Sequence, residues 1–174
     1  MIELFCGRGN GLAAWESLGF SHIEGVDRSP RLLSEYRGNA MCSVADCREI
    51  PVASSSRDVA AIHGGLHHLE RLPQDLEDVV GEVRRILKPG GRLLIVEPWQ
   101  TPFLALVHEC CRRRVVRKLW RKLDALAEMT ELEASTYFSW LAQPEVVLES
   151  IHRAFEPVRM RIAFGKLFLL AQPR

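Results

Sequence analysis

The stretch "ELFCGRGNG" (residues 3–11) lies behind a short apolar run and ahead of a segment with helical spacing. Its glycines are Gly7, Gly9 and Gly11, at alternating positions. Glycine lets the backbone approach a ligand closely, and the first turn of a helix presents unpaired N–H groups with a partial positive charge. A glycine-rich turn between a strand and a helix therefore predicts a site for a nucleotide-like or carboxylate-bearing ligand.

The residues that follow predict an alternation of strands and helices. Strands are predicted at 1–5, 22–27, 42–46, 58–63 and 92–97, and helices at 11–19, 29–36 and 76–87. Ser29 and Pro30 suit the cap and the first position of the second helix, and "KPGG" (88–91) is expected to end the third. Strands that alternate with helices imply a parallel sheet covered on both faces.

The end of the chain follows another pattern. "VRMRIAF" (158–164) alternates apolar residues with arginines, as a half-exposed edge strand does, whereas "KLFLLA" (166–171) is apolar throughout, as a central strand is. Gly165 separates them, so we expect an antiparallel hairpin whose last strand lies inside the sheet.

The length and composition of the chain exclude several classes of protein. At 174 residues we expect a single domain, and a net charge of +1 demands neither nucleic acid nor an acidic substrate. The five cysteines include no C-x-x-C pair, which favours a reducing cytoplasm over a disulfide framework or a zinc ribbon. No apolar stretch is long enough for a membrane span, and no signal peptide precedes the first strand. Since that strand begins at Met1, relatives are expected to carry a leading segment.

A dinucleotide fingerprint would need a third glycine where Leu12 stands, which disfavours a nicotinamide-dependent oxidoreductase. The stretch 3–11 instead resembles the acidic-x-x-x-G-x-G motif of class I S-adenosylmethionine-dependent methyltransferases. "GVDRS" (25–29) and "ADCREIP" (45–51) resemble later motifs of that family. "LHHL" (66–69) and "ILKPGGRLLIVEP" (86–98) are similar to its type 11 branch, which includes ubiquinone and menaquinone biosynthesis methyltransferases. The resemblance covers about residues 1–99.

The resemblance implies an α/β, Rossmann-like three-layer sandwich with a mostly parallel sheet of seven strands, or nearly so, and an antiparallel C-terminal strand. It implies S-adenosylmethionine as cofactor, with Asp27 receiving the ribose hydroxyls and Asp46 the adenine amino group. Phe5 stands where many members carry a glycine, which would narrow the space beside the methionine moiety. The predicted cofactor-binding residues are Glu3, Phe5, Gly7, Gly9, Asn10, Asp27, Arg28, Asp46, Cys47, His63 and Gly64. Hydrogen bonding within the protein is an alternative role for Glu3.

Methyl transfer from a sulfonium is an in-line displacement, so the protein mainly positions and desolvates the acceptor. A base helps where the acceptor is a hydroxyl or an acidic carbon. His67 and His68, just after the fourth strand, are the predicted catalytic residues, and a structural role for one of them is equally open. We expect no metal, because no carboxylate or cysteine lies near the histidines at ligand spacing.

Residues 100–143 are expected to form a helical insert or lid. Within it "CRRRVVRKLWRKLDALAEM" (111–129) predicts a helix with basic residues at 112–122 and apolar ones at helical spacing. Its apolar side would pack on the protein or, alternatively, contact a membrane surface or a lipophilic acceptor. Aromatic residues expected around that pocket are Trp99, Trp120, Tyr137, Phe138 and Trp140.

We therefore expect a small-molecule acceptor, lipophilic or anionic, and no nucleic acid partner. No Pro-Cys nucleophile follows the fourth strand, which disfavours DNA cytosine methylation. Two alternatives stay open: an RNA or protein methyltransferase that docks through the basic segment 112–122, and a cofactor-binding module without catalysis. The sequence does not indicate an oligomeric state.

Overall fold

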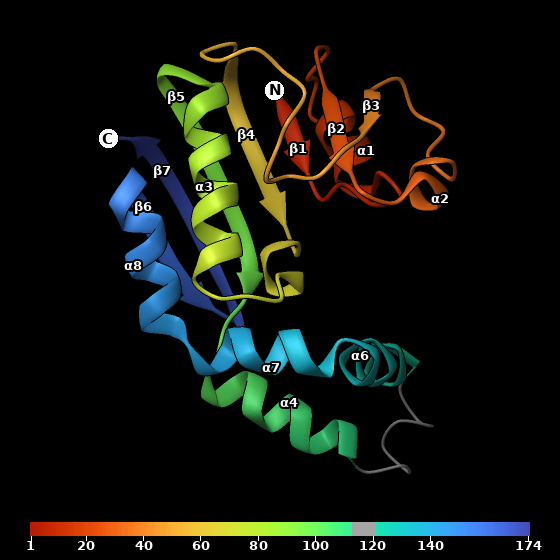
Figure 1. Cartoon of the computed structure of the whole chain (residues 1–174). Helices are drawn as coiled ribbons and strands as arrows, with labels where there is room; N and C mark the ends of the chain where they lie inside the picture. The colour runs from red at the N-terminus through yellow and green to blue at the C-terminus, as the bar shows by residue number, and fades with distance from the viewer. Residues whose placement is uncertain (113–120) are drawn as a thin grey trace.

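A computed structural model describes residues 1–112 and 121–174, which form a sheet of seven strands in the order β3-β2-β1-β4-β5-β7-β6 (Figure 1). The strands are β1 (Ile2–Leu4), β2 (Glu24–Asp27), β3 (Met41–Val44), β4 (Arg57–His63), β5 (Leu87–Pro98), β6 (Phe155–Ala163) and β7 (Lys166–Pro173). β1 to β5 pair in parallel, and β7 runs antiparallel to both its neighbours, β5 and β6. The predicted hairpin is confirmed, with its last strand inside the sheet.

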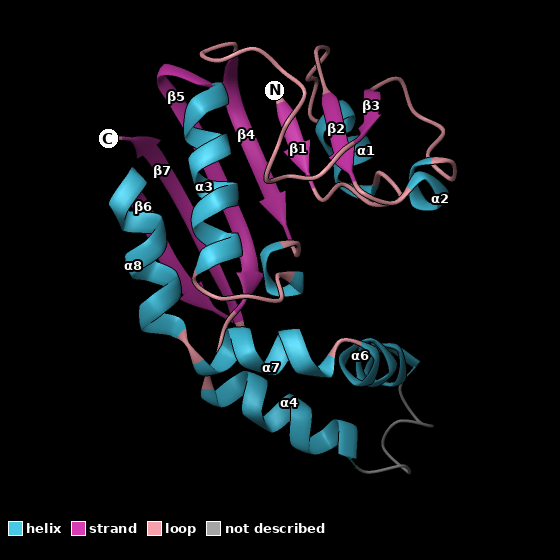
Figure 2. Cartoon of the chain, viewed as in Figure 1, coloured by secondary structure: helices cyan, strands magenta, loops and turns pink. Residues whose placement is uncertain are grey.

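Helices lie on both faces of this sheet and at one end of it (Figure 2). They are α1 (Asn10–Ser17), α2 (Pro30–Leu33), the short 3₁₀ helix η1 (Leu66–His68), α3 (Gln74–Ile86), α4 (Pro102–Arg112), α6 (Arg121–Leu132), α7 (Ala134–Ala142) and α8 (Pro144–Ala154). In the figure, α3 and α8 cover the front of the sheet and α1 lies behind β2. α4, α6 and α7 lie at the end of the sheet toward which β4 and β5 point. The result is the expected Rossmann-like three-layer arrangement.

The predicted element boundaries need two corrections. "KPGG" does not separate α3 from β5 but lies within β5, because Leu87 already pairs with Arg57 and the chain passes Gly90 with a φ of 78°. The helix predicted at 29–36 ends at Leu33. Its cap is as predicted, since the Ser29 hydroxyl accepts a hydrogen bond of 3.2 Å from the Leu32 N–H.

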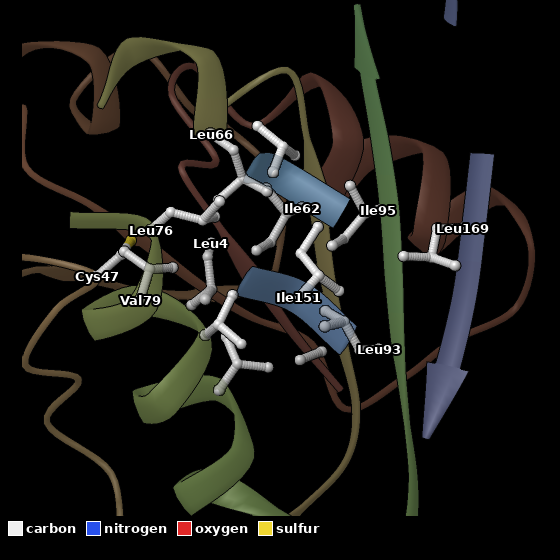
Figure 3. Packing of buried hydrophobic residues seen from close by; sticks show 14 of the residues in the cluster. Leu4, Cys47, Ile62, Leu66, Leu76, Val79, Leu93, Ile95, Ile151 and Leu169 are labelled. Carbon is white, nitrogen blue, oxygen red and sulfur yellow. The ribbon is translucent and has the colours of Figure 1, made fainter. Parts of the chain in front are cut away.

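The core lies between the central strands and the helices α3 and α8 (Figure 3). Leu4, Ile62 and Ile95 come from β1, β4 and β5 and are at most 1% exposed. Leu76 of α3 and Ile151 of α8, both at 0%, pack against them. Full burial of such side chains stabilises by about 1.5–3 kcal/mol each, so this core holds the ends of the three strands in fixed relative positions. Within the described residues, every helix is too short or too polar to cross a bilayer.

Candidate active site

The turn after β1 is tied to the end of β2 by one carboxylate. Asp27 accepts hydrogen bonds of 2.8 Å from the backbone N–H of Gly7 and from that of Ser29, one on each oxygen. Gly9 follows in a left-handed conformation, with φ 79°, and directly precedes α1. The glycine-rich turn and the acid predicted at the tip of β2 thus lie in direct contact.

Glu3 lies beneath this turn and is 4% exposed. Its Oε2 accepts a hydrogen bond of 2.8 Å from the indole N–H of Trp15. A Cβ at Gly11 would lie 2.0 Å from the Glu3 carboxylate, so α1 passes directly over it. Burial raises the pKa of Glu3 to about 7, and the indole hydrogen bond opposes that rise only in part. The structure thus shows a hydrogen-bond partner for Glu3 within the protein.

Phe5 joins the turn after β1 to the turn after β4. Its φ is 56°, in the left-handed region that side chains rarely adopt. A Cβ at Gly65 would lie 2.4 Å from both Cβ and Cγ of Phe5, so the two backbones approach closely only because residue 65 has no side chain. Phe5 therefore packs against the turn that follows β4.

Asp46, after β3, is held by Arg48. The Arg48 side chain donates to Asp46 Oδ1 at 3.0 Å and Oδ2 at 2.7 Å, and the Arg48 backbone N–H donates to Oδ1 at 2.9 Å. These hydrogen bonds lower the pKa of Asp46. Arg28 lies 3.7 Å from Oδ2, which brings the loops after β2 and β3 together. Burial raises the pKa of the neighbouring Cys47 thiol to about 12, so the thiol is neutral.

A cavity of about 380 Å³ opens at the carboxyl ends of β4 and β5, beside the helices α4 and α7. Its wall combines apolar and ionisable residues. The lining consists of His63, Gly64, His67, His68, Val96, Glu97, Pro98, Phe103, Leu104, Val107, Glu133, Tyr137, Phe164, Gly165 and Lys166. Gly64, in the cavity wall, precedes Gly65, and Gly65 approaches Phe5 at the start of the glycine-rich turn. Desolvation lowers the pKa of His63, at the end of β4.

Glu97 organises the polar end of this cavity. Its side chain is fully buried, and Oε1 accepts hydrogen bonds from the backbone N–H groups of Gly65 (2.7 Å) and Leu66 (2.9 Å). Its Oε2 lies 2.8 Å from Nδ1 of His67. Because a carboxylate can only accept, this contact places a proton on Nδ1, and in the neutral imidazole Nε2 then carries the lone pair. Glu97 is not among the site residues predicted from the sequence, although a carboxylate at the end of an apolar strand signals a buried acid that needs partners.

Glu133, the N-cap residue of α7, completes the cluster. Its Oε2 lies 3.5 Å from Nε2 of His67 and 3.6 Å from Nδ1 of His68. Desolvation and the neighbouring His67 lower the pKa of His68. Glu133 caps α7 through its backbone oxygen, which accepts a hydrogen bond from the Tyr137 N–H. Glu133 is not among the site residues predicted from the sequence, because it is distant from the histidines along the chain.

Of the aromatic residues expected around the pocket, Tyr137 lines the cavity, with its ring edge-on to His67 at 5.7 Å. Trp99 and Trp140 are buried in the core instead, and the Trp140 indole donates to the Pro98 oxygen at 2.8 Å. Phe138 is half exposed and lines a different cavity. Trp120 and most of the basic segment 112–122 lie outside the described residues.

Known proteins resemble this chain in sequence and in fold. The family model described as "Methyltransferase domain" matches residues 2–95, or 94 of the 174 residues. The ubiquinone/menaquinone biosynthesis C-methyltransferase UbiE of Syntrophotalea carbinolica is 32% identical over 109 residues, which cover 57% of this chain and 44% of that protein. The demethylmenaquinone methyltransferase of Mycobacterium marinum is 26% identical over 149 residues, 83% of this chain and 62% of that protein. The chain therefore spans less than half the length of the first of these relatives.

Solved structures share the fold at low identity. The PH0226 protein of Pyrococcus horikoshii OT3 has a TM-score of 0.73 at 17% identity, covering 99% of this chain and 82% of that one. An S-adenosylmethionine-dependent methyltransferase of Mesorhizobium loti has a TM-score of 0.64 at 18% identity, covering 98% and 89%. With a family model that matches more than half of its residues, the chain belongs to the type 11 methyltransferase domain family, within the class I S-adenosylmethionine-dependent methyltransferases.

Proposed function

We propose that this chain transfers a methyl group from S-adenosylmethionine to a small-molecule acceptor. The observation that supports this most directly is the position of the cavity: its wall includes Gly64, and the next residue, Gly65, approaches Phe5 just before the glycine-rich turn. A cofactor held over the turn would present its sulfonium to an acceptor in the cavity. The two partners of an in-line displacement would then be held in adjacent sites.

The predicted cofactor residues suit the adenosyl group. Each oxygen of Asp27 already accepts one backbone hydrogen bond, and a carboxylate oxygen has a second lone pair for a ribose hydroxyl. Asp46 lies one strand further along the same edge, where the adenine amino group would lie. We carry forward the other residues as cofactor contacts: Glu3, Phe5, Gly7, Gly9, Asn10, Arg28, Cys47, His63 and Gly64.

The acceptor we propose is a lipophilic ring that carries a hydroxyl or an acidic carbon. Phe103, Leu104 and Val107 give the cavity an apolar wall, while Lys166 would suit an anionic group. The relatives named for ubiquinone and menaquinone biosynthesis support a quinol-like acceptor.

His67 and His68 remain the proposed catalytic residues. Nε2 of His67 lies in the cavity wall with a free lone pair and accepts a hydrogen bond or a proton from the hydroxyl of the acceptor. Glu97 keeps the imidazole ring in that orientation. The rest of the protein's contribution is to position the acceptor and to exclude water.

Titration calorimetry with S-adenosylmethionine, followed by incubation with radiolabelled cofactor and a set of quinols, tests the proposal. Label in a small-molecule product is the expected result. Label in RNA or protein from cell extract would support instead an enzyme that docks through residues 112–122. Binding of S-adenosylmethionine without turnover of small molecules, RNA or protein would support a non-catalytic module. Binding of NAD in place of S-adenosylmethionine would overturn the assignment of S-adenosylmethionine as the cofactor.

We also propose that the protein acts in the cytoplasm. The five cysteines are odd in number and include no C-x-x-C pair, a pattern that suits a reducing compartment better than a disulfide framework. Fractionation of cells that express the tagged protein would test this location.

A further inference from the structure

We propose that His67, His68 and Glu133 bind a divalent transition-metal ion at the polar end of the cavity. One ligand atom from each of the three residues lies within 4.8 Å of the others. The Glu133 Oε2 lies 3.5 Å from His67 Nε2 and 3.6 Å from His68 Nδ1. Ligand atoms at about 2.0–2.1 Å from a tetrahedral zinc ion are about 3.3 Å apart. Both separations are therefore within a few tenths of an ångström of those of an occupied site.

The two atoms that face one another across this site lack hydrogen-bond partners. Both Nε2 of His67 and Oε2 of Glu133 are shielded from solvent, and neither has a hydrogen bond. His67 as a whole is 5% exposed. A buried polar atom without a partner costs about 1–3 kcal/mol, so native proteins rarely leave one without a function. A single cation between the two atoms would satisfy both.

Glu97 supplies the outer contact that histidine ligands usually have. A metal-binding histidine almost always donates its second ring N–H to a carboxylate, carbonyl or water, which fixes the tautomer and orients the ring. Here Nδ1 of His67 contacts Glu97 at 2.8 Å, and the other Glu97 oxygen is held by the backbone N–H groups of Gly65 and Leu66. The other ring nitrogen, Nε2, is the atom that lies 3.5 Å from Glu133 Oε2.

The ligand set selects the class of ion. Two imidazole nitrogens and one carboxylate suit zinc, iron or another first-row transition ion, whereas magnesium and calcium take oxygen ligands. Three protein ligands leave further coordination positions open, and these would face the cavity because all three residues line it. If the ion is bound, Nε2 of His67 is one of its ligands, and the acceptor hydroxyl would contact the ion instead of Nε2. Binding of the ion itself does not depend on methyl transfer.

The test uses the whole chain after treatment with a chelator. Titration with Zn²⁺ by calorimetry should show one ion per chain, and Co²⁺ should give an absorption spectrum of nitrogen and oxygen ligands without thiolate charge-transfer bands. His67→Ala and Glu133→Gln should abolish this binding. His68→Ala, at a partly exposed position, should weaken it strongly, and Glu97→Gln should weaken it about 10- to 100-fold.

His22→Ala is the matched control. His22 is exposed and precedes β2, so it lies at the amino ends of the parallel strands, whereas the cavity lies at their carboxyl ends. This variant should bind Zn²⁺ as the native chain does. Circular dichroism and thermal unfolding establish that each variant is folded. His68→Ala and Glu133→Gln keep the test valid if His67→Ala fails to fold. No uptake by the native chain, thiolate bands with Co²⁺, or unchanged affinity in the folded Glu133→Gln and His68→Ala variants would each overturn the proposal.

Discussion

Oδ2 of Asp27 accepts a hydrogen bond of 2.8 Å from the backbone N–H of Gly7, so the acid at the end of β2 holds the turn that follows β1. Its other oxygen accepts from Ser29 at the same distance. Asp27 therefore fixes the shape of the glycine-rich turn and is also the residue proposed to receive the ribose. A change at this position should affect both stability and cofactor affinity.

Asp27→Ala should weaken the affinity for S-adenosylmethionine by about 1–3 kcal/mol, because a partly buried hydrogen-bond acceptor is lost. Calorimetric titration measures this change. Ser29→Ala is the control: it removes the cap of α2, with a stability cost of about 1 kcal/mol, but keeps Asp27 and should leave cofactor affinity unchanged. Unchanged affinity in a folded Asp27→Ala variant would remove Asp27 from the cofactor site.

Glu97→Ala should lower the free energy of unfolding by about 3–5 kcal/mol. The change leaves the Gly65 and Leu66 N–H groups and the His67 ring without their buried partner. Chemical denaturation measures the effect, and Glu156→Ala, at an exposed site, should stay within about 0.5 kcal/mol of the native chain. An effect no larger than that of the control would mean that the Glu97 contacts do not stabilise the fold.

Glu3 should make stability fall as the pH rises. Its pKa is about 7 in the folded chain against 4.5 in a model peptide, so between these values the folded state holds more protons than the unfolded state. The contribution of Glu3 to the free energy of unfolding is most favourable below pH 4.5 and is lost as the pH rises through about 7. Glu3→Gln keeps an acceptor for Trp15 and should be the more stable protein above pH 7, by up to about 3 kcal/mol. Denaturation curves across this range would contradict the prediction if the two proteins showed the same pH dependence.

Phe5 and Gly65 should be coupled energetically. Gly65→Ala puts a methyl group against the Phe5 side chain and should cost about 1–3 kcal/mol. In a Phe5→Gly background the same change should cost much less, because the obstructing ring is absent and the left-handed backbone at residue 5 is no longer strained. A double-mutant cycle of unfolding free energies measures the coupling, and additive effects would contradict the contact.

Val107→Trp should separate acceptor binding from cofactor binding. Val107 lines the cavity from α4, and a larger ring there should fill much of the acceptor space. We expect methyl transfer to fall at least tenfold, while the affinity for S-adenosylmethionine measured by calorimetry stays the same. Equal losses of both would mean that the cavity and the cofactor site are not distinct.

Much of the fold was predictable because it depends on local patterns. The apolar periodicity of 76–87 predicted α3, and the contrast between the alternating and the continuously apolar segments of the C-terminal hairpin predicted that β7 lies inside the sheet. The start of β5 was not predictable in this way, because "KPGG" has the residues of a helix stop. Only pairing of Leu87 with Arg57 on β4 extends the strand through it.

For the site, the amino-acid order by itself determined that a glycine-rich turn, Asp27 and Asp46 lie at one edge of a parallel sheet, because successive parallel strands present their carboxyl ends there. Only the tertiary structure decided that Glu97 and Glu133 meet His67 and His68. Glu97 lies at the end of β5, the two histidines lie in η1, and Glu133 caps α7. The distances between these side chains depend on how the elements pack against one another, and a local pattern of residues does not predict that packing.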